Sequence, residues 1–122
     1  QPIARRSTAQ LVVYRGFHAG VAASAVKNDS TNTATIVAPS QDVLAGDYVV
    51  YFFANRSTDT TSWTAGEGQI ARGSVMGTQA TRYSTFISDA GGPSSAGVDP
   101  GASATVNLPS IRGIGISVVL RP

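Results

Sequence analysis

The residues best suited to chemistry in this sequence are seven acids and one histidine. The acids stand singly, with no Asp-x-Asp calcium spacing and no close carboxylate pair of the kind that glycosidases use. They are Asp29, Asp42, Asp47, Asp59, Glu67, Asp89 and Asp99. His18 has no nucleophile or orienting acid beside it, so we expect a structural loop residue. The pattern predicts no catalytic residue, cofactor or metal site, and therefore a protein that is not an enzyme.

Two polar loops carry the candidates for contact with a partner or ligand. Asp89 and Asp99 flank the longest loop, residues 89–101, where they either share a cation with backbone carbonyls or cap turns. Capping is favoured because Asp does this routinely. Trp63 follows loop 56–62, and its indole either plugs the end of a core, which we favour, or faces a ligand or partner. The candidate contact residues are Arg56, Asp59, Trp63, Asp89 and Asp99.

The elements that must position these residues are β-strands. Residues 48–55, YVVYFFAN, hold six consecutive aromatic and Val residues and predict a central strand. Residues 102–108 alternate apolar and polar side chains, and residues 112–121, RGIGISVVLR, alternate large apolar residues with mostly small ones. Residues 8–15, TAQLVVYR, predict a strand buried on both sides.

About eight such strands, ten or so residues apart and without a convincing amphipathic helix, predict one all-β domain over residues 1–122. We expect an antiparallel two-sheet β-sandwich, jelly-roll-like, with a closed barrel as the alternative. No apolar run approaches the roughly 20 residues of a membrane helix, so membrane insertion is not expected. The first residues lack the apolar run of a signal peptide, and we expect a processed product or a segment of a longer chain.

The composition limits the kinds of partner that we expect the protein to bind. Nine basic and seven acidic residues give a net charge of +2, too small an excess to predict nucleic-acid binding. Charged residues make up only 13% of the chain, and all the basic residues except Lys27 are Arg, which suits packed interfaces. The absence of Cys excludes disulfides and thiolate sites. At the chain ends, Arg5, Arg6 and Arg121 either lie against a partner or belong to solvated tails.

The chain contains a series of short motifs, and in their order it resembles the C-terminal β-rich domain of virion structural proteins from tailed phages, especially those of actinobacteria. The motifs are LVVYRG at 11–16, APS at 38–40, AGDYVVYFFANRS at 45–57, TTSWTAGEGQIAR at 60–72, ISDAGGP at 87–93 and SVVLRP at 117–122. The resemblance implies a β-sandwich that serves as a minor tail, fibre or capsid-decoration component, with no catalytic residues to carry over. Relatives have further β-rich sequence before the first motif, which implies a fragment, a processed form or a shorter variant here.

The leading functional hypothesis is thus a structural protein located in the virion. Its expected partners are other capsid or tail subunits and further copies of itself in a homo-oligomer. The alternative is a carbohydrate-binding or host-adhesion module that contacts a host glycan through Trp63 and the loops 56–62 and 89–101.

Overall fold

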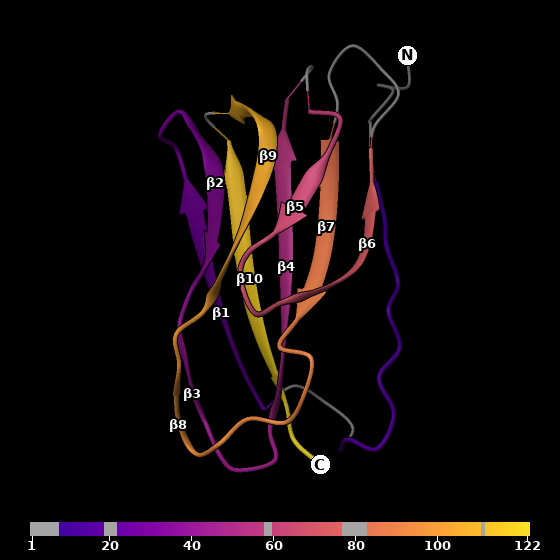
Figure 1. Ribbon diagram of the computed structural model, residues 1–122, viewed down its shortest axis with the longest axis vertical. Coiled ribbons are helices and arrows are strands. Elements are labelled where there is room, and N and C mark those ends of the chain that lie inside the picture. Colours follow the sequence, from indigo (N-terminus) through magenta and orange to yellow (C-terminus); the bar gives the residue numbers. More distant parts are fainter. Residues whose placement is uncertain (1–7, 19–21, 58–59, 77–82, 111) are drawn as a thin grey trace, which may run out of the picture.

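The structure, a computed structural model, describes residues 8–18, 22–57, 60–76, 83–110 and 112–122 (Figure 1). These residues form ten strands and no helix, which confirms the all-β prediction with more strands than the eight or so expected. The strands are β1 (Ala23–Asp29), β2 (Thr33–Ala38), β3 (Gln41–Val43), β4 (Tyr48–Arg56), β5 (Trp63–Ala65), β6 (Ile70–Val75), β7 (Tyr83–Asp89), β8 (Gly97–Asp99), β9 (Ala102–Ser110) and β10 (Gly113–Leu120). A search of the same residues finds no helix able to span a membrane.

The strands build three open antiparallel sheets. A five-stranded sheet has the order β1-β10-β4-β7-β6, a three-stranded sheet the order β2-β9-β5, and β3 pairs with β8. Four of the pairs are nested: β1 with β10, β2 with β9, β3 with β8, and β4 with β7. The chain therefore folds as one long antiparallel hairpin bent across two layers. None of these sheets closes on itself, so the barrel alternative is wrong for the described strands.

The core lies between the two larger sheets, which overlap in Figure 1. From the five-stranded sheet, β4 contributes Val49, Tyr51 and Phe53, each at most 3% exposed. Ile36 of β2 and Ala104 of β9 face them from the three-stranded sheet. This shared core makes the arrangement sandwich-like. The prediction that residues 48–55 form a central strand is confirmed, because β4 lies between β10 and β7.

β10 turns its small residues toward this core. Gly115 pairs with inward-facing Phe53 in the sheet register and lies so close to β2 that a Cβ atom would approach the Val37 carbonyl oxygen to 2.0 Å. A Cβ at Gly113 would meet the Ile36 side chain at 2.9 Å. Because only glycine permits this approach of the sheets, the larger residues of β10, such as Ile114 and Ile116, lie on the outer face.

The prediction of a doubly buried strand at residues 8–15 is wrong. This N-terminal segment, residues 8–18, forms no strand, and Leu11 and Val13 are 88% and 68% exposed. It lies over the outer face of the five-stranded sheet, where the ring centroids of Tyr14 and Phe17 are 5.5 and 5.8 Å from that of Tyr48. Side-chain contacts and one backbone hydrogen bond, from the His18 N–H to the Arg121 carbonyl oxygen at 2.8 Å, hold the segment in place of a strand ladder. Its alternating residues therefore face the sheet and the solvent in turn.

Two further differences come from short strands. The long loop 89–101 contains β8, which pairs with β3. Trp63 begins β5, so it belongs to a strand rather than to the loop before it. Three-residue strands of this kind give no periodic pattern that a sequence reading detects.

The close contact between β10 and β2 predicts that a larger side chain at this place lowers the stability of the fold. Gly115→Ala should destabilise the fold by about 3 kcal/mol, because a methyl group would overlap the β2 backbone. The matched change Gly92→Ala should shift stability by less than about 0.5 kcal/mol, because no atom lies within 4 Å of its added Cβ. Urea denaturation of both variants measures the difference, and equal stabilities would contradict the close approach.

Candidate functional site

Trp63 packs its ring inside the end of the sandwich. The indole stacks on Phe86 with centroids 5.7 Å apart and an interplanar angle of 6°, and its centroid is 6.4 Å from that of Phe53. The Trp63 Nε1–H donates a 3.0 Å hydrogen bond to Ser84 Oγ. The indole thus packs against the core and its polar edge is hydrogen-bonded within the chain, which favours the plugging interpretation over a ligand-facing one.

A buried polar chain continues from this indole. The Ser84 hydroxyl donates to Asn55 Oδ1, and Asn55 Nδ2 donates to Thr60 Oγ1 at 2.8 Å. Ser84, Asn55 and Thr60 are all at most 4% exposed. These hydrogen bonds hold Thr60 in loop 56–62. In the same loop, the backbone N–H of Thr61 donates to Asn107 Oδ1 at 2.8 Å. Sequence reasoning missed this network, although Asn55 at an inward position of β4 is a sign of it.

Asp89 is the most heavily engaged of the predicted site residues. Its side chain is fully buried and forms an ion pair with Arg72 of β6, whose side chain is 37% exposed. Tyr14 Oη donates to Oδ2 at 2.8 Å, Tyr48 Oη to Oδ1 at 2.9 Å, and the Gly91 N–H to Oδ1 at 2.9 Å. The carboxylate therefore joins the N-terminal segment, β4, β6 and the turn after β7.

The electrostatics of Asp89 follow from these donors. Burial acts to raise the pKa of its carboxyl group, but the hydrogen bonds from Arg72, Tyr14, Gly91 and Tyr48 together hold that pKa below its ordinary value. The same burial, with the hydrogen bond to Asp89, raises the pKa of the Tyr14 and Tyr48 hydroxyls. At neutral pH the cluster is thus an ionised carboxylate held by a guanidinium and two neutral phenols.

Asp99 has separate partners. Tyr51 Oη lies 2.8 Å from both of its carboxylate oxygens, and the Gly101 N–H donates to Oδ1 at 2.9 Å. Asp89 and Asp99 therefore each cap a glycine turn, as the favoured interpretation predicts. In the described part of the chain, no group of three or more His, Cys, Asp or Glu residues is placed to hold a metal ion.

Arg56 does not join these residues in one site. The Arg56 guanidinium lies 5.8 Å from the ring centroid of Tyr83, a cation–π distance. Asp59 lies outside the described residues, so its predicted contact stays a prediction. The four described candidates, Arg56, Trp63, Asp89 and Asp99, are thus distributed over separate clusters.

Asp47 and Arg121 form a second ion pair that sequence reasoning missed. Arg121 Nε donates to Oδ1 at 2.9 Å and Nη2 to Oδ2 at 2.8 Å, while the Leu44 N–H donates to Oδ2 at 2.8 Å. The Arg121 hydrogen bond is the main reason that the pKa of Asp47 is lowered, and it outweighs the burial of the carboxylate, which acts to raise that pKa. Arg121 is therefore anchored in the fold rather than part of a solvated tail.

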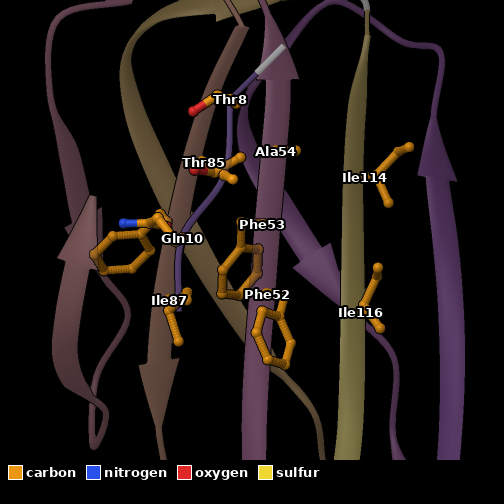
Figure 2. Close-up of a pocket in the computed structure, with 11 residues that line it drawn as sticks. Thr8, Gln10, Phe52, Phe53, Ala54, Thr85, Ile87, Ile114 and Ile116 are labelled. Atoms are coloured by element: carbon orange, nitrogen blue, oxygen red, sulfur yellow. The ribbon is translucent and has the colours of Figure 1, made fainter. Parts of the chain in front are cut away.

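The outer side of the five-stranded sheet is the strongest candidate surface for a partner. We define the apolar face as Val26, Phe52, Ile114, Ile116 and Val118. In the register Val26 lies opposite Ile116, which in turn lies opposite Phe52. Figure 2 shows Phe52, Ile114 and Ile116 along neighbouring strands. Val26 is 59% and Ile114 41% exposed, so large apolar side chains remain open to solvent on this face.

The Asp89 cluster predicts both a stability loss and a pH dependence. Asp89→Asn should destabilise the protein by roughly 3 kcal/mol at pH 7, because it removes the charge of a buried carboxylate that accepts hydrogen bonds from Arg72, Tyr14 and Tyr48. Since the folded-state pKa of Asp89 is lowered, its contribution is complete above pH about 4 and is lost as the pH falls through the folded pKa. Urea denaturation between pH 7 and pH 2 should show the gap between wild type and variant narrowing at acidic pH.

Asp42→Asn is the matched control, because Asp42 is exposed on β3. It should leave stability within about 0.5 kcal/mol of wild type throughout. A pH-independent gap for Asp89→Asn would contradict the role given to its ionised carboxylate.

Comparison of the chain with protein-family models, with curated proteins and with solved structures gives no match in any of the three. The functional argument therefore rests on the residues of this chain and on their geometry.

Proposed function

We propose that this protein is a non-enzymatic structural protein of a tailed-phage particle, a capsid-decoration or minor tail component that works as a homo-oligomer. The observation that carries the proposal is the apolar face. The motif order described above directs it to a virion, and the low charge and rigid internal polar clusters suit a subunit whose work is contact with other subunits.

The apolar face supports assembly because it is unusual. In an antiparallel domain, the side chains on the outer face of a sheet are normally polar. Here Val26, Ile114 and Ile116 bring large apolar side chains together on the solvent side. Their burial against a partner is favourable, at about 25 cal/mol for each Å² of apolar surface removed from water. None of the five residues of the apolar face is charged. Two copies can therefore pack these faces against each other in an isologous contact, in which both contribute the same surface, without burying an unpaired charge.

We further propose that the fold is a two-sheet jelly roll. Support comes from the nested pairing of β1 with β10, β2 with β9, β3 with β8 and β4 with β7, which is that of a long hairpin rolled into two layers. Jelly rolls serve in viral capsids and also in lectins and cupins, so the fold by itself does not select the function. The glycan-binding alternative lacks a favouring observation, because the indole of Trp63 is engaged within the core.

Self-association is tested by a charge placed on the apolar face. Wild-type protein should sediment as a defined oligomer, and Val26→Glu should shift it to monomer, because a carboxylate would be buried without a partner. The control Val98→Glu alters an apolar residue of β8 that is also exposed but lies outside the face, and it should leave the oligomer intact. A monomeric wild type, or equal effects of the two variants, would exclude this interface.

The virion assignment has its own test. Antibodies raised against the chain should label purified particles of the phage that encodes it, on the capsid or on the tail, in immunogold electron microscopy. Particles that lack the chain by both labelling and mass spectrometry would overturn the assignment, whatever the oligomeric state of the purified protein.

A further inference from the structure

Two arginines and a tyrosine form a row at one end of the five-stranded sheet, where β4 ends and β7 and β10 begin (Figure 1). Arg56, the last residue of β4, pairs with Tyr83, the first residue of β7. On its other side, the Arg56 N–H donates to the Arg112 carbonyl oxygen at 3.1 Å. This bond extends the register of β4 with β10 by one residue beyond the pair of Asn55 with Gly113. Cross-strand partners share one face of a sheet, so the three side chains are neighbours, and we call them the arginine row.

The arginine row borders an open hollow of about 570 Å³. Ile114 and Ala54 also line it, and each stands two residues from an arginine of the row, on the same face of the sheet. Asn28 of β1 lies opposite Ile114 in the register and adds an amide group to the lining. None of the described residues that line the hollow is acidic. The hollow therefore combines two positive charges with an aromatic ring and a small apolar surface.

The electrostatics of the arginine row favour an anion. Like charges directly opposite each other on neighbouring strands are destabilising, and Arg56 and Arg112 occupy such positions. Both residues are exposed. The Arg56 guanidinium lies 5.8 Å from the ring centroid of Tyr83, a cation–π contact that holds the charge at this end of the sheet. An anion that contacts both guanidinium groups would offset their repulsion and gain charge-assisted hydrogen bonds.

We propose that this hollow binds a phosphate monoester whose ester group is small and apolar or aromatic. A phosphate ester carries a charge of about −1.5 to −2 at pH 7 and three acceptor oxygens, so it can accept from guanidinium groups on two neighbouring strands. A carboxylate fits less well, because one arginine fork engages both of its oxygens and its single charge balances only one guanidinium group. The ester group packs on Ile114 and Ala54. The inference goes beyond the proposed virion role and does not depend on it.

Small probes test the ligand class in isothermal titration calorimetry with the full chain. Phenyl phosphate should bind saturably at one site, inorganic phosphate and benzoate each about tenfold more weakly, and phenol without measurable affinity. Raising NaCl from about 0.05 M to about 0.5 M should weaken phenyl phosphate binding several-fold, because salt screens charges near solvent. Phenyl phosphate that binds no better than benzoate or phenol would overturn the choice of phosphate. Inorganic phosphate that binds as tightly as phenyl phosphate would overturn the role of the apolar surface, and absence of all binding would overturn the site.

Variants then locate the site. Arg112→Gln should weaken phenyl phosphate binding about tenfold or more, and Arg112→Lys should recover part of it, because lysine keeps the charge but lacks the planar fork. Arg15→Gln is the matched control, because it removes the same charge from an exposed arginine that does not line the hollow. It should bind phenyl phosphate like wild type. If Arg15→Gln and Arg112→Gln weaken binding equally, the probe responds to net charge alone and the inference fails.

Thermal unfolding and sedimentation of the same variants separate the site from a structural role and from assembly. Phenyl phosphate should raise the Tm of wild type and of Arg15→Gln but not that of Arg112→Gln, because a ligand that binds only the folded state stabilises it. An equal rise in all three proteins would contradict the site. Arg112 is not part of the apolar face, so Arg112→Gln should lose the ligand and still sediment like wild type. Loss of the ligand only together with the oligomer would contradict a site formed within one chain.

Discussion

The approach of β10 to the backbone of β2 is the constraint on which the rest of the structure depends. Gly113 and Gly115 leave no room for a side chain between the two layers. The core is therefore built mainly by β4 and β7 on one side and by β2 and β9 on the other, while β10 adds Val119 beyond its two glycines. Since residues of a strand alternate, the same two glycines oblige Ile114 and Ile116 to face outward.

The outer face that results needs covering, and the N-terminal segment covers part of it. Val50 of β4 and Ile87 of β7 are at most 2% exposed although they lie on that outer face. The segment is held there by Tyr14 at the buried carboxylate of Asp89, 75 residues further along the chain. By itself, the carboxylate of Asp89 would be unfavourable on an apolar sheet. It is stabilised by four donor residues, and these come from the segments that it joins. The rest of the outer face, toward β1, stays exposed, and there β1 places Val26 between the polar residues Ser24 and Asn28.

The sequence predicts strands where alternation or β-branched residues persist, as in β4 and β10. It does not predict which face of β10 is inward, because large apolar residues on one face suggest a core until the backbone of β2 is in place. It fails at residues 8–15 for a related reason, since an extended segment lying on a sheet has the composition of a strand within one. The partners of Asp89 and Asp47 depend on register between segments far apart in the chain, which local spacing does not encode.

The distribution of polar groups separates structure from function in this fold. Asp89, Asp47 and Asn55 are buried and fully engaged, each where two or more segments meet. The hydrogen bonds of such groups are used to specify the fold. Thr8, Gln10 and Thr85 differ, because each has a buried oxygen without a hydrogen-bond partner among the described residues. All three residues lie where the N-terminal segment meets the five-stranded sheet, so the hydrogen bonds that fix this contact are those of Tyr14 at Asp89 and not those of these oxygens.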